Sequence, residues 1–90
     1  MSAQVMAQLR SALERAFAPT SLEIIDDSAA HAGHPGNRGG GHYRVTLVAE
    51  AFRGRSRLER HRLVHAAVAP LFAGAVHALN IAARVPDEPA

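Results

Sequence analysis

The chain has 90 residues, of which 48% are hydrophobic and 20% charged, a composition typical of one small globular domain and not of a disordered segment. It contains no cysteine, which excludes disulfide bonds and a cysteine-only metal site, and no apolar run is long enough to span a membrane. All ten basic residues are arginine and the net charge is only +2, so the place where the arginines gather says more about an anionic partner than the total charge does. We expect a cytoplasmic protein with a single domain over residues 1–85.

The N-terminal segment is predicted to be a helix that packs and carries no chemistry. Apolar residues recur at helical spacing from Val5 to Phe17, with polar residues between them. Ser2 is a candidate N-cap, and Pro19 ends the helix.

A short strand is predicted from Leu22 to Asp27. The acidic pair Asp26 and Asp27 at its end suggests an enzymatic acid and base. Neighbouring residues of a strand point to opposite faces, however, so the two carboxylates would not converge on one substrate. We therefore interpret the pair as turn-forming residues.

A glycine-rich loop is predicted from Ser28 to Gly41, and its length indicates a segment that is either functional or mobile. His31 and His34 lie three residues apart in it, but metal-assisted hydrolysis would need a third ligand and an open coordination position. An enzyme is therefore the least supported class. Gly36 and Gly39 spell a G-x-x-G sequence, which grips a nucleic-acid backbone only between two helices, whereas this loop links two strands.

The clearest strand is predicted from His42 to Glu50, where apolar and polar residues alternate. Ser56 and Glu59 then have the spacing of a capping box, which marks the start of a helix from about Arg57 to about Ala73. Pro70 should kink or thin the last turn of this helix.

A final strand is predicted from Val76 to Arg84, and the tail of residues 86–90 should fray. The expected fold is α+β with the order α-β-β-α-β. Strands one and two should be antiparallel, and strands two and three parallel with a right-handed crossover. Both helices should cover one face of this three-stranded mixed sheet and leave the other face partly open.

Five arginines gather at the start of the second helix, where the partial positive charge of the helix N-terminus makes cations unfavourable. Together with the free N–H groups of the first turn they could bind a phosphate backbone or the carboxylate of a peptide-like partner. The alternative is a solvated basic face, partly offset by Glu50 and Glu59. The five residues are Arg53, Arg55, Arg57, Arg60 and Arg62.

Four pieces of the sequence, in this order, resemble the BolA-like family over nearly all of residues 5–84. They are LEIIDDSAAH, HYRVTLVAEAF, FRGRS followed by LERHRLV, and VHALNI. The resemblance implies a class II K homology-like fold, which agrees with the element order above. It also implies two activities: partnership with monothiol glutaredoxins in heterodimers that share a [2Fe-2S] cluster, and DNA binding in transcription regulation.

By position, the resemblance makes His77 one metal ligand and His31 the other, with His34 as the alternative in the same loop. This is the His-type branch of the family. A cluster needs four ligands, so two imidazoles would be completed by thiolates from a glutaredoxin and its glutathione. The chain alone should hold no cluster and be a monomer or a weak homodimer.

The sequence therefore predicts an interaction protein in iron-sulfur cluster trafficking or iron and redox regulation, and no enzyme. DNA binding through the five arginines is the alternative. The two activities could coexist, with a bound glutaredoxin covering the same face. Of the other histidines, His61 is interpreted as structural or DNA-facing, and His42 and His65 are assigned no role.

Overall fold

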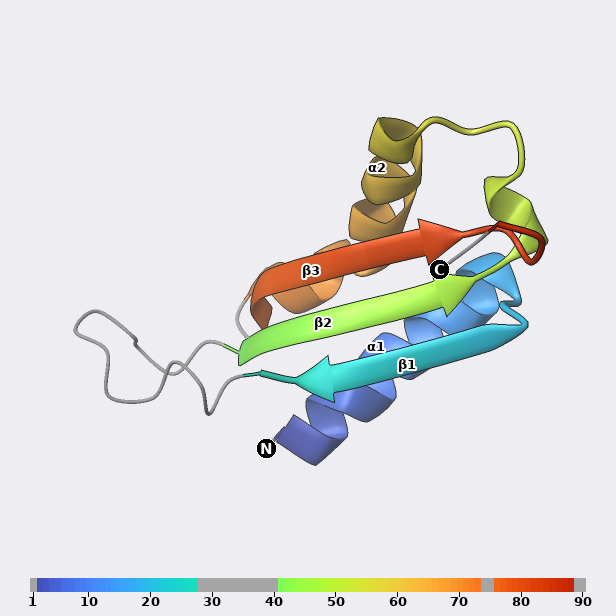
Figure 1. The fold of residues 1–90 in the computed structure, drawn as a ribbon. Helices are drawn as coiled ribbons and strands as arrows, with labels where there is room; N and C mark the ends of the chain where they lie inside the picture. The colour runs from blue at the N-terminus through green and yellow to red at the C-terminus, as the bar shows by residue number, and fades with distance from the viewer. Residues whose placement is uncertain (1, 28–40, 74–75, 89–90) are drawn as a thin grey trace.

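The structure, a computed structural model, describes residues 2–27, 41–73 and 76–88 (Figure 1). The predicted order of helices and strands is confirmed, and the predicted loop lies, but for Gly41, outside the described residues. None of the helices in these ranges is long and apolar enough to cross a membrane. The elements are α1 (Ser2–Phe17), β1 (Ser21–Asp26), β2 (Gly41–Val48), the 3₁₀ helix η2 (Glu50–Phe52), α2 (Arg57–Ala67), the 3₁₀ helix η3 (Ala69–Ala73) and β3 (Val76–Arg84).

The three strands form one mixed sheet in the order β1-β2-β3. β1 is antiparallel to β2, with Ile24 opposite Val45, and β3 is parallel to β2, with Ile81 opposite Val45 on the other side. The parallel pairing follows from the crossover through α2, which brings the chain back to the end of the sheet where β2 begins. The predicted topology of the sheet is confirmed.

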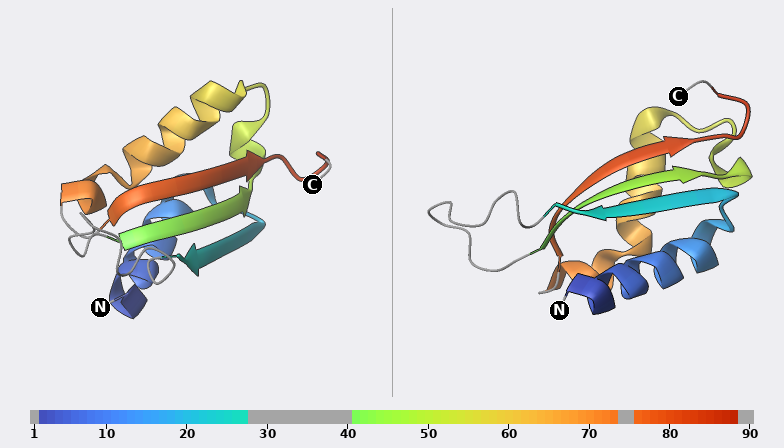
Figure 2. Two further views of the ribbon diagram at one scale, coloured as in Figure 1. Left: turned by 60° about the vertical axis from the view of Figure 1, so that its left-hand side comes forward. Right: turned by 60° about the horizontal axis from the view of Figure 1, so that its bottom comes forward.

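Both helices lie on one face of the sheet, as Figure 2 shows from two directions. Tyr43, Val45 and Leu47 face the helices and are at most 4% exposed, whereas Arg44 between them is exposed. This alternation has the period of two expected for a strand with one covered face. The buried core consists of Leu9, Leu13, Ile24, Tyr43, Val45, Leu47, Ala49, Phe52, Val64, Val68, Val76, Ile81 and Val85.

The second helix is shorter than predicted. α2 ends at Ala67, and the chain continues as η3 to Ala73. Pro70 has no N–H to donate to the carbonyl four residues before it. The chain tightens instead, and Leu71 N donates to Val68 O at 2.9 Å, a bond over three residues. The change to a narrower helix expected at Pro70 is therefore observed, and the 3₁₀ helix starts one residue before the proline.

Strand β2 ends two residues earlier than predicted. Ala49 N donates to Arg84 O at 2.8 Å, and Phe52 N then donates to Ala49 O at 3.2 Å, which turns the chain into η2. The turn places Phe52 in the core with no exposed surface. Burial of one large side chain thus overrides the apolar-polar alternation that continues to Glu50.

Residues 86–88 of the predicted tail form a turn at the end of β3. Val85 is 5% exposed, and its N–H donates to Glu88 Oε1 at 2.7 Å. Glu88 N donates back to Val85 O at 3.1 Å, which closes a turn. The chain after β3 therefore folds back beside α2 and brings two carboxylates, Asp87 and Glu88, to the arginines there.

Candidate functional site

Phe52 holds the arginine-rich segment against the sheet. Its buried ring lies 4.9 Å from the ring of Phe17 at the end of α1, measured between centroids. Arg55 N donates to Phe52 O at 3.1 Å, and Gly54 between them has a φ of 78°, a left-handed conformation that favours glycine. This tight turn directs the chain into the start of α2.

The predicted capping box at the start of α2 is confirmed. Glu59 N donates to Ser56 Oγ at 3.1 Å, and Ser56 N donates to Glu59 Oε1 at 2.8 Å. The bond from the backbone N–H of Ser56 is the largest cause that lowers the pKa of the Glu59 carboxyl. Glu59 is thus part of the helix cap, and its negative charge stays fixed beside the arginines.

Arg53, a predicted nucleic-acid contact, is bound by two carboxylates of its own chain. Its Nε and Nη2 each lie 2.7 Å from a Glu50 oxygen, and Nη2 lies 2.8 Å from Asp87 Oδ1. Hydrogen bonds from Arg53 lower the pKa of both carboxyl groups. The guanidinium is half exposed, so these pairs add little stability, but they occupy N–H groups that a phosphate would need.

Arg60 connects three parts of the chain. Its Nε donates to Arg55 O at 3.0 Å, and its Nη1 donates both to Ala83 O at 3.0 Å and to Glu88 Oε1 at 2.7 Å. The Arg60 side chain is only 14% exposed. Its hydrogen bond is the largest cause that lowers the pKa of Glu88, followed by the bond from the backbone of Val85. Arg60 therefore ties α2 to the end of β3 and to the C-terminal turn.

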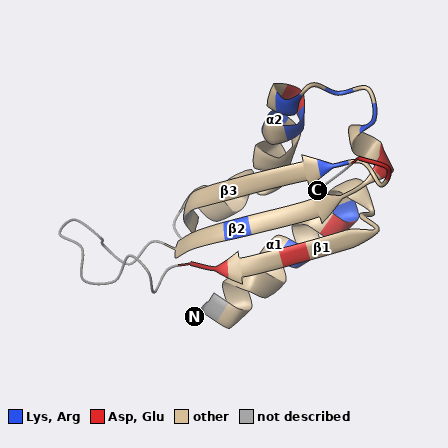
Figure 3. Cartoon of the chain, viewed as in Figure 1, with Lys and Arg blue, Asp and Glu red and all other residues tan. Residues whose placement is uncertain are grey.

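The five predicted arginines thus divide into two groups. Arg53 and Arg60 are held by carboxylates, whereas Arg55, Arg57 and Arg62 are exposed and form no salt bridge within the described ranges. The alternative of a basic face offset by acidic residues is partly right, because Glu50 pairs directly with Arg53. Figure 3 shows positive and negative residues together at this end of the molecule. Sequence reasoning missed Asp87 and Glu88, because only the fold-back of the tail brings them here.

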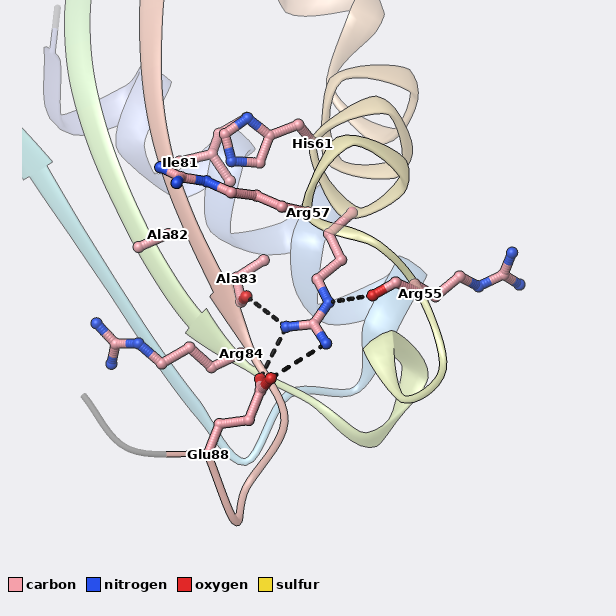
Figure 4. A pocket seen from close by; sticks show the side chains of 9 residues that line it. Arg55, Arg57, His61, Ile81, Ala82, Ala83, Arg84 and Glu88 are labelled. Carbon is pink, nitrogen blue, oxygen red and sulfur yellow. Dashed lines mark hydrogen bonds and ion pairs between the residues drawn. The ribbon is translucent and has the colours of Figure 1, made fainter.

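A groove of about 480 Å³ lies between the start of α2 and β3 (Figure 4). Arg57 and His61 line it from the helix, and Ala82 and Arg84 line it from the strand. Glu88 lies at one end, bound to Arg60. His61, interpreted from the sequence as structural or DNA-facing, lies in the groove wall. Arg84 was missed, because it is far from the other arginines in sequence.

The segments that contain the predicted histidine ligands join the sheet at the end opposite the groove. Gly41 pairs with Val76 and His42 pairs with Ala78, so His77 is an extra residue in a bulge of β3. The segment of residues 28–40 leaves β1 and enters β2 at this same end, because Asp27 N donates to His42 O at 2.7 Å. His31 and His34 lie outside the described residues, as does the side chain of His77, so their roles as ligands stay predictions.

A hollow of about 300 Å³ opens on the uncovered face near this end, lined by His42 and Asn80 among others. Arg44 Nε lies 3.4 Å from Asp27 Oδ2 beside it. Asp26 is opposite Tyr43 on the helix side of the sheet, so the two neighbouring carboxylates point apart as predicted. His42 lines the hollow because of the register between β2 and β3. The alternation of residues within one strand does not reveal that register.

The donor atoms of the chain fit part of an iron-sulfur site. Among the described residues no three His, Cys, Asp or Glu side chains lie close enough to hold a metal ion together. The sequence contains imidazoles but no thiolate. A [2Fe-2S] cluster needs four ligands, normally with thiolates among them, so this chain suits a site shared with a second polypeptide.

The two candidate sites are far apart along β3. Arg60 contacts Ala83, which follows His77 by six residues, a distance of about 20 Å along a parallel strand. Figure 1 shows the start of β3 and the start of α2 at opposite ends of the sheet. A standard protein interface of about 800 Å² per partner is wide enough to span this separation, so the expectation that one bound glutaredoxin covers both regions stays a prediction, and each end can be tested separately.

Comparisons with known proteins agree with the resemblance found in the sequence. Human BolA-like protein 1 is 49% identical over 84 residues, which are 93% of this chain and 60% of that protein, so the chain spans about 60% of the length of such relatives. The protein named DNA-binding transcriptional regulator BolA from Escherichia coli K12 is 33% identical over 77 residues, 86% of this chain and 71% of that protein. The solved BolA domain of SufE1 from Arabidopsis thaliana has a TM-score of 0.82 and 36% identity, covering 92% of this chain and 93% of that domain.

The profile of the family described as BolA-like protein matches residues 13–88. These residues include both candidate sites, the fold-back of the tail and every strand. The chain therefore belongs to the BolA-like protein family.

Proposed function

We propose that this protein is a partner of monothiol glutaredoxins that co-ligates or receives a [2Fe-2S] cluster, in iron-sulfur trafficking or iron and redox regulation. The single observation that supports this most is the backbone geometry at the start of β3. The bulge residue His77 lies at the end of the sheet where the segment containing His31 and His34 leaves and returns. The proposal assigns no enzymatic reaction to the chain.

In this proposal His77 and His31, with His34 as the alternative, each hold iron through a neutral ring nitrogen. The glutaredoxin and its glutathione supply the missing thiolates. Because imidazole is neutral, such mixed ligation would raise the reduction potential of a bound cluster, as in Rieske centres. A ligating nitrogen must be deprotonated, so complex formation should weaken as the pH falls through the histidine range. Without the partner, the chain is a monomer or a weak homodimer.

The test is anaerobic mixing of the protein with a monothiol glutaredoxin, glutathione, iron and sulfide, followed by visible absorption and circular dichroism. We expect a spectrum that differs from that of the glutaredoxin alone and that is lost with His77→Ala. His31→Ala and His34→Ala, made separately, identify the ligand in the loop. His65→Ala is the matched control, because His65 lies on an exposed part of α2 beside Phe72. A spectrum unaltered by replacing His77, His31 and His34 together would refute the proposal.

DNA binding is the second candidate, and one observation favours it. Arg55, Arg57 and Arg62 are exposed near the start of α2 without salt bridges in the described ranges, and the relative from Escherichia coli carries the name of a DNA-binding regulator. Phosphate contacts release counterions, so binding to duplex DNA should fall steeply with salt. Arg57→Gln with Arg62→Gln should abolish binding, whereas Arg10→Gln with Arg15→Gln, which removes the same charge from exposed positions of α1, should matter less. Equal effects at both places would contradict this assignment.

A further inference from the structure

The groove beside β3 wraps around a free edge of the sheet. β3 is the last strand in the order β1-β2-β3, so no strand of the described residues pairs with its outer side. Arg84 O accepts a bond from Ala49 N on the β2 side. Because backbone groups alternate in direction along a strand, those of Ala83 and Ile81 point outward. Ala83 O is bound by Arg60 there, and Ile81 lines the groove.

The groove carries positive charge on both sides of this edge. Arg57 reaches toward β3 from the helix side, and Arg84 comes from the strand itself (Figure 4). Arg60, which is already bound to Glu88, and Arg55, whose side chain extends away from the groove in Figure 4, complete the arginines of the lining. A guanidinium offers a planar fork of N–H groups that matches a carboxylate, which makes this a surface for acidic groups.

The C-terminal turn shows that this surface accepts carboxylates carried by a peptide. Glu88 binds Arg60 through both oxygens, at 2.7 and 3.3 Å, and accepts a third bond from the backbone N–H of Val85. Asp87, its neighbour, binds Arg53. Two adjacent acidic residues of one segment, Asp87 and Glu88, thus already bind arginines at the end of this groove.

The lining also distinguishes a peptide from a single-stranded nucleic acid. Sites for single strands usually present aromatic rings on which bases stack. Among the described residues that line the groove there is no Phe, Tyr or Trp, and the imidazole of His61 is the one ring that a base could stack on; the nearby Phe52 is fully buried. Small side chains at Ala82 and Ala83 instead leave room for another backbone to approach the strand edge.

We propose that the groove between the start of α2 and the free edge of β3 is a docking site for an extended acidic peptide segment of a partner protein. The segment pairs with the edge near Ile81, and its alternate side chains reach Arg57 on one face and Arg84 on the other. This is the mode of strand addition, in which the backbone gives affinity and the side chains give specificity. The site does not depend on the histidine proposal, because it lies at the opposite end of β3.

The experiment uses a fluorescently labelled ten-residue peptide of valine, threonine and four glutamates, with a glutamine-for-glutamate peptide as control. Fluorescence anisotropy at about 0.1 M salt should show binding of the acidic peptide alone, weakening as more salt is added. The double variant Arg57→Gln with Arg84→Gln should weaken binding roughly tenfold or more, since each removes a charge-assisted contact. The matched variant Arg10→Gln with Arg15→Gln removes the same charge from α1 and should change binding less than about twofold, as distant surface charges are screened.

Nuclear magnetic resonance of the labelled protein gives the second readout. Amide signals of Ile81 and Ala83 should shift on addition of the acidic peptide, while those of α1 stay in place. Three results would overturn the proposal: no binding, equal loss with the Arg10 and Arg15 variant, or stronger binding of single-stranded or duplex DNA at the same amides. The last of these would assign the groove to nucleic acid.

Discussion

The side chain of Phe52 should be among the largest single contributors to stability, and it also positions the arginine segment. It has no exposed surface and is the largest fully buried side chain in the described ranges. Replacing a buried phenylalanine by alanine costs about 3–5 kcal/mol, from lost transfer free energy and the cavity left behind. The contact with the ring of Phe17 contributes about 0.5–1.5 kcal/mol of this. Since domains of this kind are stable by about 5–15 kcal/mol, Phe52→Ala should leave a marginally stable protein.

The assay is urea unfolding followed by far-ultraviolet circular dichroism. With a slope of about 1–3 kcal/mol per molar urea, the midpoint should fall by roughly 1–5 M in Phe52→Ala. Leu58→Ala is the control in the same segment, because Leu58 is 58% exposed and its loss should change the free energy of unfolding by less than about 0.5 kcal/mol. A loss below about 1 kcal/mol at Phe52, or one equal to that at Leu58, would refute the packing described here.

Three further changes have defined outcomes. Ser56→Ala removes the acceptor of the capping box and should lower the free energy of unfolding by about 1 kcal/mol in the same urea assay; an unchanged midpoint would mean that the cap contributes nothing. Gly54→Ala forces a side chain into the left-handed region and should cost about 1–2 kcal/mol, visible as a lower melting temperature, whereas a stabilised variant would contradict the observed φ. The pKa of Glu88 is lowered from its usual 4.5, so its contribution to stability is present above pH 4.5 and is lost as the pH falls toward the lower folded value. Glu88→Gln should therefore be less stable at neutral pH and lose less on acidification; parallel pH profiles of the two proteins would count against the Arg60 contact.

Local patterns in the sequence were sufficient for the elements and their order. The capping box at Ser56 and Glu59, the alternation along β2 and the helical spacing in α1 are each patterns of residues close in sequence. The antiparallel and parallel pairings then followed from the presence or absence of a helix between strands. Boundaries were less certain, because the ends of β2 and α2 were decided by burial of Phe52 and by the missing N–H of Pro70.

The candidate sites depended on tertiary structure in a way that sequence spacing cannot supply. The arginine cluster was visible in the sequence, as was Glu50, which pairs with Arg53. Asp87 and Glu88 reach Arg53 and Arg60 only because the chain turns back after β3. Strand register likewise placed His77 at a bulge beside the ends of the segment that contains His31 and His34, and about 20 Å of β3 separates it from the groove. The sequence by itself determined which side chains are available, since composition and periodicity are local properties. Only the fold decided which of these side chains contact one another, because those contacts form between segments that are distant in the chain.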